Sequence, residues 1–441
     1  MVSTEIQDKN IVRFKSLFDH FEQQLNGHRK HPIHEIRRVA ASHLEDLRFP
    51  TRRDEDYKYT SFARVLNQEY GFPKKATVDQ AKINALQVEG LDAYLLVFVN
   101  GILDESLSHL GELEPGLSVQ TVSNALKDAQ VGAFVEEKLS ANAKSDNPFV
   151  VLNSTFAEGG VFVHVAKNAL IEKPIHFIQY NTATDQAFIY HPQRLVKVEQ
   201  GAQVSFIDSH YGEEGSTYFS NVVNVFEVGA NTQVKHFKLQ TESENAFQVN
   251  NTTAYQAQDS TYTNLALDLG GRIVRNNLST IHQGQNVTSN LYGALLVDGD
   301  QHVDNQTFID HAIPHCQSNE LYKAVLDGKS TGVFNGKVMV RKDAQKTNAY
   351  QQNAALVLSE KANMDSKPQL EIYADDVKCS HGATIGQLDQ TSMFYLRSRG
   401  MNEAMAKQTL QYAFLIDVLE EIDNEAITEK AEALIYQKFS K

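Results

Sequence analysis

The sequence of 441 residues predicts a mainly β protein, with a β-solenoid core flanked by α-helical regions. Three observations predict this fold class. Apolar residues recur at helical spacing near both ends of the chain. Between them, short runs rich in Val, Ile, Thr, Tyr, Phe and Asn alternate with period two, and turn-like segments repeat within these runs. A chain of this length is expected to form two or three units, which we place at 1–147, 148–385 and 386–441.

The N-terminal region 1–147 is predicted to be helical or mixed. Two helices each present one apolar face, and Pro50 ends the second. The run AYLLVFVNG predicts a buried strand that ends at Asn100–Gly101, and helices are favoured over 122–129 and 136–142. The apolar positions of the two helices are Ile11, Phe14, Phe18, Phe21 and Leu25 in the first, and Ile36, Ala40, Leu44 and Leu47 in the second.

The central region 148–385 carries a weak internal repeat. Glu-x-Gly-Ala occurs at 199–202 and again at 227–230, each time between strand-like runs. A solenoid needs this alternation of strand and turn, because each coil stacks on the previous one and buries an apolar ladder. A large antiparallel sandwich is the rival fold, and Asn335–Gly336 would suit a hairpin turn in it. We favour the solenoid because so long a stretch of strands without a helix exceeds a typical sandwich.

The C-terminal region 386–441 is predicted to be helical again. Asp389 and Asn402 are placed to cap two helices, and Gly400 can end the first. These helices could cover the open end of the solenoid or dock another protein. The apolar faces of the last two helices contain Leu410, Phe414, Val418 and Ile422, and then Ile427, Ala431, Leu434 and Ile435.

The composition excludes several classes of protein. The formal net charge is −14 and no basic run is present, so nucleic acid is not an expected partner. The N-terminal stretch MVSTEIQDKN does not resemble a signal peptide, and no apolar run is long enough for a membrane helix. Two cysteines 63 positions apart suit a reducing compartment. We therefore expect a cytoplasmic protein that does not interact with membranes.

Motifs of common enzyme classes are absent from the sequence. There is no H-E-x-x-H, C-x-x-C or G-x-S-x-G. A carbohydrate-cleaving β-helix enzyme would need converging carboxylates, for which Asp304 and Asp310 are the available pair. Such a pair arises by chance in any strand region, so a non-enzymatic protein is the preferred interpretation.

The stretch FIDHAIPHCQS contains the first candidate metal site. His311, His315 and Cys316, next to Asp310, offer the nitrogen and sulfur ligands that zinc or iron accepts. Pro314 interrupts any regular strand here, so the spacing does not predict their geometry. Histidines that simply stabilise a turn are the alternative.

The stretch DDVKCSHGATIG contains the second candidate. On a strand, Cys379 and His381 would point to the same face, because side chains alternate with period two. The pair could share an ion or a cluster, or supply a thiolate activated by Lys378. A buried structural cysteine is the commoner outcome for an isolated thiol. A catalytic dyad would also need a third orienting group, and none is evident.

Residues 304–400, including KCSHGAT, resemble the SufB/SufD family of the SUF iron–sulfur cluster assembly system. PTRRDEDYKYT at 50–60 is also similar, although the family usually has Trp where this chain has Tyr57. The resemblance extends over essentially the whole chain. SufB-type chains carry more cysteines and an acidic pair near the position of His381, so the sequence resembles the SufD type more closely.

The resemblance implies a right-handed parallel β-helix that pairs with a SufB-like paralogue through its last strands. It implies that the C-terminal helices dock a SufC-like ABC ATPase, and that the isolated chain can form a homodimer. The nascent cluster would be built at the interface between subunits, where His381 is implicated and Cys379 is its neighbour. We expect no cofactor bound stably by the chain alone, but a transient iron–sulfur cluster or iron shared with the partner. The alternative is a structural adaptor or iron-entry subunit without metal ligands of its own.

Overall fold

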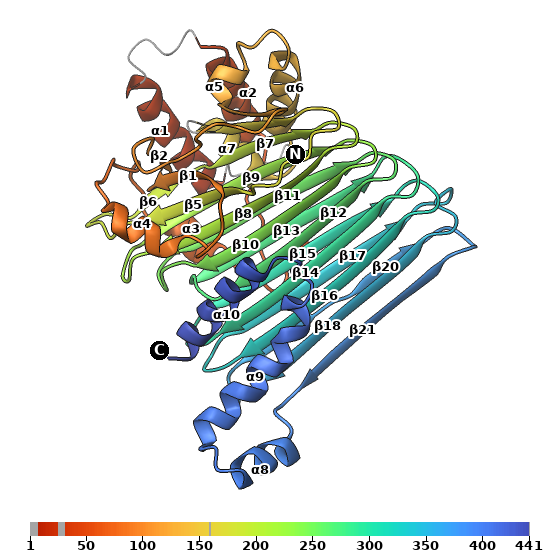
Figure 1. The fold of residues 1–441 in the computed structure, drawn as a ribbon. Coiled ribbons are helices and arrows are strands. Elements are labelled where there is room, and N and C mark those ends of the chain that lie inside the picture. The colour runs from red at the N-terminus through yellow and green to blue at the C-terminus, as the bar shows by residue number, and fades with distance from the viewer. Residues whose placement is uncertain (1–7, 25–30, 158–159, 441) are drawn as a thin grey trace, which may run out of the picture.

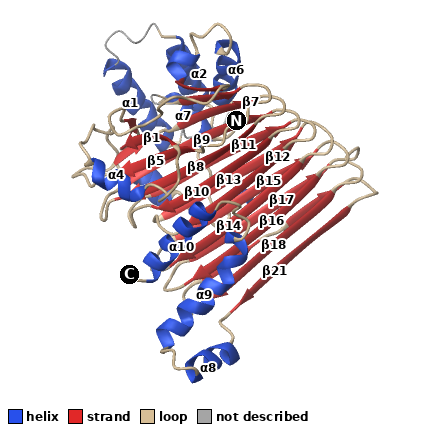
Figure 2. Cartoon of the chain, in the orientation of Figure 1, coloured by secondary structure: helices blue, strands red, loops and turns tan. Residues whose placement is uncertain are grey.

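Two stacked sheets of mostly parallel strands form the body of the computed structural model, which describes residues 8–24, 31–157 and 160–440 (Figure 1). Helices pack at the periphery (Figure 2). The prediction of a mainly β solenoid between helical ends is confirmed. Two parts of the predictions lie outside the described residues. These are Leu25 of the first helix, and residues 1–7, on which part of the signal-peptide prediction depends.

The N-terminal helices cover the outer face of one sheet. Phe14, Phe18 and Phe21 pack with Phe149 and Phe219 in one buried apolar cluster. The expected helices and the expected strand, β1 (Tyr94–Val99), are present. The helical elements are α1 (Lys9–Gln24), α2 (Pro32–Leu44), η2 (Glu55–Tyr57), α3 (Ala63–Asn67), α4 (Gln80–Leu86), α5 (Val122–Ala125), α6 (Gly132–Ala143) and α7 (Pro148–Thr155).

Helix α7 lies where helical periodicity was expected to stop. Its side chains are buried on all sides, so the sequence shows no amphipathic stripe. Asn147 accepts a hydrogen bond from the Phe149 backbone N–H, and Pro148 occupies the first turn. These residues are favourable at a helix start and stabilise α7 despite its β-branched composition.

Within the described residues one sheet contains ten strands, and the other contains eleven, nine of them in its main order. The ten-stranded sheet has the order β2 (Ile102–Leu103), β1, β5 (Ile175–Asn181), β8 (Gln203–Gly212), β10 (Gln233–Thr241), β12 (Thr261–Asp268), β14 (Thr288–Val297), β16 (Gln317–Leu326), β18 (Asn348–Val357) and β21 (Lys378–Gly386). The other sheet has the order β19 (Asn363–Ser366), β17 (Thr331–Val340), β15 (His302–His311), β13 (Ile273–His282), β11 (Phe247–Gln256), β9 (Tyr218–Val228), β7 (Gln193–Val198), β4 (Val161–Val165) and β3 (Leu117–Thr121), with β20 (Gln369–Ile372) on β17 and β6 (Phe188–Tyr190) on β9.

Parallel register stacks equivalent residues from rung to rung. Val204, Val234 and Tyr262 follow one another on β8, β10 and β12 and point into the space between the sheets, which we call the lumen. The intervening residues point outward, and Phe237 and Leu239 meet the helices that cover this sheet. Both faces of the strands are therefore buried over most of the solenoid.

The sequence repeat corresponds to stacked turns. Residues 199–202 connect β7 to β8, whereas 227–230 begins in the last two residues of β9 and continues into the connection to β10. The Gly201 backbone N–H donates to the Ala230 carbonyl oxygen, which joins the two turns. The neighbouring turns also contain residues with positive φ, including Asn231, Asn286 and His315. Asn and His tolerate this left-handed conformation better than most residues. The turns therefore recur in structure even where their sequences differ.

Asn335–Gly336 does not form the hairpin that would have favoured a sandwich. Both residues lie in the middle of β17, which pairs in parallel with β15. Gly336 leaves room for the Gln351 side chain across the lumen, because a Cβ atom would overlap its amide. The glycine therefore reflects packing in the lumen.

The two ends of the solenoid differ. At the first end, the short antiparallel strands β2 and β3 lie on the sheet edges. At the other end, β21 is bonded only to β18 in the strand order, and its residues are largely exposed. The last rung of the ten-stranded sheet is thus an open edge.

The C-terminal helices are α8 (Gln390–Ser398), α9 (Glu403–Leu419) and α10 (Glu425–Phe439). Asp389 and Asn402 cap α8 and α9 as predicted. Helices α9 and α10 bury Leu415, Val418 and Ile435 against the outer face of the ten-stranded sheet, so they do not cover its open edge (Figure 1). Among the described residues, no helix is long and apolar enough to cross a membrane.

Candidate functional site

Cys379 and His381 lie on β21, the exposed last strand. Cys379 is paired in register with Ala349 of β18, and His381 with Gln351. Ala349 and Gln351 are buried residues of the lumen face. Cys379 and His381 therefore share this face, as the period-two pattern predicted.

The two side chains differ in exposure. Cys379 is half-buried and packs against the edge of the lumen core, whereas His381 is exposed. In the part of the chain that the structure describes, no side-chain hydrogen bond is formed by His381. The opposite sheet ends in β19 and β20, which both pair with β17, and His381, Ala383 and Ile385 on the lumen face of β21 are exposed. The exposed imidazole of His381 thus lies beside the half-buried thiol of Cys379 at the open end of the lumen.

The environment of Cys379 does not suit a nucleophile. Burial raises the pKa of its thiol, which favours the protonated form. Lys378, the proposed activating cation, is exposed and points to the opposite face of the strand. The thiol would become a thiolate most readily on binding a metal ion.

The structure does not bring the three weaker metal candidates together. His311 is buried in the lumen, where its Nε2 lies 2.9 Å from Ser318 Oγ, and burial lowers its pKa to about 4. His315 is exposed and occupies the repeated left-handed turn position. The buried Cys316 thiol lies 3.4 Å from the carbonyl oxygen of Gly284. Each residue thus has a structural role in its own coil.

A neighbour of His311 was missed in the sequence. The rings of His282 and His311 meet edge to face with centroids 4.5 Å apart, and His282 Nε2 lies 2.8 Å from Ser289 Oγ. Only the stacking of β13 on β15 brings them together. Among the described residues, no group of three or more His, Cys, Asp or Glu side chains could hold a metal ion.

The two carboxylates considered for a carbohydrate-cleaving enzyme are engaged separately. Asp304 accepts a hydrogen bond of 2.6 Å from buried Arg275, whose guanidinium lies 4.0 Å from the centre of the Tyr57 ring. Asp310 is paired with Arg341 through two hydrogen bonds. Each carboxylate therefore forms an ion pair with an arginine.

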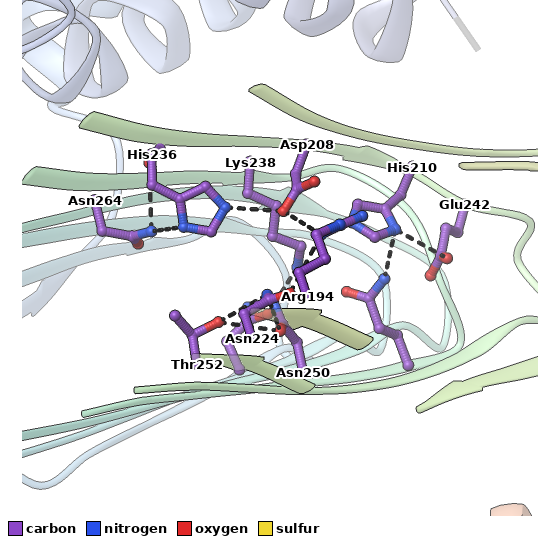
Figure 3. A network of polar contacts seen from close by, with 12 residues as sticks. Arg194, Asp208, His210, Asn224, His236, Lys238, Glu242, Asn250, Thr252 and Asn264 are labelled. Carbon is purple, nitrogen blue, oxygen red and sulfur yellow. Dashed lines mark hydrogen bonds and ion pairs between the residues drawn. The ribbon is translucent and has the colours of Figure 1, made fainter. Parts of the chain in front are cut away.

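Farther inside, the lumen contains a buried polar network (Figure 3). Arg194 donates to Asp208 over 2.6 Å, and His236 Nε2 lies 2.8 Å from the same carboxylate oxygen. Burial alone would raise the pKa of Asp208, but Arg194 and His236 outweigh burial and hold it below its ordinary value. Lys238 is paired with Asp268 in the next rung at 2.8 Å.

Glu242 lies at one side of this network (Figure 3). It is fully buried, and its nearest basic group is His210 Nδ1, 4.0 Å away. Burial raises the pKa of the Glu242 carboxyl to about 8, although Lys238 opposes the shift. The carboxyl is therefore mostly protonated at neutral pH in the folded protein.

The Glu242→Gln variant should lose less stability than the wild type as the pH rises from 5 to 9. The folded state keeps a proton on Glu242 up to about pH 8, whereas an unfolded glutamate loses it near its ordinary pKa of about 4.3. Folded chains thus bind more protons in this window, and stability falls with rising pH. Urea unfolding at several pH values measures the effect. Glu244→Gln, at an exposed position two residues later, is the control, and parallel curves for both variants would contradict the prediction.

Comparisons with known proteins identify the family of this chain. Residues 180–414 match the family described as SUF system FeS cluster assembly, SufBD core domain, and residues 8–177 match the SufBD protein N-terminal region. The chain belongs to the SufBD family. Cys379 and His381 lie within the matched core domain.

Individual SufBD relatives are similar over nearly the whole chain. The iron–sulfur cluster assembly protein SufD of Escherichia coli is 30% identical, covering 90% of this chain and 92% of its own. An iron–sulfur cluster assembly SufBD family protein of Synechocystis is 32% identical, covering 88% of this chain and 86% of its own. SufD of Bacillus subtilis is 25% identical over 91% of this chain and 93% of its own. The chain is thus a SufBD iron–sulfur cluster assembly protein.

Proposed function

We propose that this SufBD chain is a scaffold subunit that holds a nascent iron–sulfur cluster, or iron, together with a SufB-like partner. The supporting observation is the open edge of β21, whose lumen-face residues His381, Ala383 and Ile385 are exposed. A strand from another chain can add to such an edge. The partner would then cover Cys379 and His381 and complete the site.

The chemistry of the two side chains supports a shared site. Imidazole nitrogen and thiolate sulfur are both ligands that iron accepts. Two ligands from one chain are too few to hold a cluster, so ligands from the partner are needed. A small contribution from each chain also allows the finished cluster to leave.

The C-terminal helices support a second contact, with a SufC-like ATPase. Phe394 and Tyr395 of α8 are 75% and 56% exposed, although α9 and α10 bury their apolar faces against the sheet. Large exposed aromatic side chains are typical of protein interfaces. Only a short connection separates α8 from β21, so a partner bound to α8 would contact the segment that directly follows the last strand.

Anaerobic reconstitution with iron and sulfide tests the shared site. The chain alone should form no stable chromophore, and the chain with its SufB-like partner should form one. Ile385→Asp should prevent both pairing and the chromophore, because Ile385 is 52% exposed on the lumen face of β21 and a carboxylate there opposes burial. Size-exclusion chromatography and visible absorbance measure the two effects.

Leu170→Asp is the matched control, since Leu170 is 60% exposed in the turn before β5, near the other end of the solenoid. This variant should pair and reconstitute normally. A full chromophore on the isolated chain, or normal pairing by Ile385→Asp, would contradict the proposal.

A further inference from the structure

Gln351 lies directly below His381 on the lumen face. The two residues are paired in register between β18 and β21, and the next residue in the same column is Glu320 on β16. Adjacent strands are about 4.8 Å apart, so side chains in one column are immediate neighbours. Gln351 is 3% exposed and Glu320 is 1% exposed, so both are buried beneath the open rung.

The Gln351 amide is held in one orientation. Its Nε2 donates a hydrogen bond to Glu320 Oε2. The opposite sheet leaves room for the amide because Gly336 has no side chain, and a Cβ atom there would overlap Gln351 Nε2. An ionised carboxylate only accepts hydrogen bonds, so the contact keeps the amide nitrogen towards Glu320 while Glu320 is ionised.

The other end of the amide is an unused acceptor. Gln351 Oε1 is buried and has no hydrogen-bond partner among the described residues. A buried carbonyl without a donor costs free energy, so such groups are rare unless a ligand or partner completes them. His381 has the nearest donor-bearing side chain in the next rung of the column.

We infer that Gln351 is a positioning residue for His381. When the imidazole turns into the lumen, its ring N–H donates a hydrogen bond to Gln351 Oε1. This inference rests on the proposed function, in which His381 is an iron ligand. Histidine ligands commonly donate their second ring N–H to an acceptor, which fixes the tautomer and the ring orientation. With one ring N–H of His381 bonded to Gln351, the other ring nitrogen of His381 would be unprotonated and directed towards the partner. Glu320 acts one step further back, by holding the amide.

Gln351→Leu tests the inference in the full chain, because it removes the acceptor and keeps a side chain of similar length. Gln352→Leu is the matched control, since Gln352 is the next residue of β18 and is exposed on the opposite face. The first readout is the tautomer ratio of His381 from nitrogen-15 NMR of histidine-labelled protein, with signals assigned by His381→Ala. Burial raises the pKa of Glu320 to about 7, so the measurement is made at pH 8, where Glu320 is mostly ionised.

The tautomer ratio of His381 should change in Gln351→Leu and stay at the wild-type value in Gln352→Leu. Gly336→Ala should reproduce the change, since the added methyl group displaces the amide while Gln351 itself is kept. If Gln351→Leu does not fold, Gly336→Ala alone tests whether Gln351 positions His381. An unchanged ratio in folded Gln351→Leu, or in folded Gly336→Ala, would overturn the inference.

The second readout is the affinity of the paired complex for iron(II) alone. Gln351→Leu should weaken binding by roughly 10–100-fold, as is typical when the acceptor behind a histidine ligand is lost. If His381→Ala leaves iron(II) affinity unchanged, the proposed function fails. If His381→Ala abolishes binding but Gln351→Leu binds normally, only the positioning role fails.

Discussion

Replacing His381 with Ala should lower the yield of iron–sulfur clusters on the paired complex by on the order of tenfold or more. The imidazole is exposed on β21 and forms no side-chain hydrogen bond among the described residues, so its loss should not disturb the fold. The variant should therefore pair normally with the SufB-like partner. Visible absorbance and acid-labile sulfide after anaerobic reconstitution measure the yield, and size-exclusion chromatography measures pairing.

Ser380→Ala is the control for this experiment. Ser380 is exposed on the same strand but faces away from the lumen, so its hydroxyl should not contribute to the site. Cys379→Ser should lower the yield less than His381→Ala, because burial disfavours the Cys379 thiolate in the unpaired chain. Normal cluster yield by His381→Ala would leave the structural adaptor as the preferred function.

Replacing Asp208 with Ala should lower the free energy of unfolding by about 3–5 kcal/mol. The substitution leaves the buried Arg194 guanidinium without its carboxylate partner and removes the acceptor near His236 (Figure 3). A buried cation without a partner is strongly destabilising, whereas the intact pair contributes little net stability. Urea unfolding at pH 7.5 measures the difference.

Asp423→Ala provides the matched control, since Asp423 also pairs with a basic residue, Lys235, but at the surface. Exposed ion pairs contribute about 0–1 kcal/mol, so this variant should be close to wild type. An equally small effect for Asp208→Ala would contradict the structural role assigned to the lumen network.

The fold could be predicted from local signals in the sequence. Asp389 and Asn402 cap their helices as expected, because capping depends only on the next few residues. The repeated Glu-x-Gly-Ala segments lie at or beside successive turns, although they are two residues out of register, and regularly repeated turns are what a solenoid requires. Helix α7 was missed because its side chains are buried on every side, which removes the periodic signal.

The lumen network could not be predicted in the same way. His236 and Lys238 alternate with apolar residues along β10, a pattern that normally indicates a strand with one face in solvent. In this fold the polar residues point inward and the apolar residues meet the covering helices. Only the stacking of strands distant in sequence reveals their partners.

The candidate site shows the same limit. Period two was sufficient to place Cys379 and His381 on one face, but Gln351 and Glu320 lie 30 and 61 positions before His381. Their column follows from the register between rungs, which a single sequence does not determine. His311 and His315 were considered as possible ligands without a predicted geometry, and the structure places His311 in the lumen and His315 at a left-handed position of the following turn.

The unlike ends of the solenoid also limit the stoichiometry of assembly. Short antiparallel strands occupy the edges at the first end, and within the described part of the chain only the β21 end presents a long parallel strand for extension. Two such bodies that meet through this end use up the extendable edge of both. If the chain pairs in the proposed way, end-to-end association would therefore stop at two chains and would not continue into a filament.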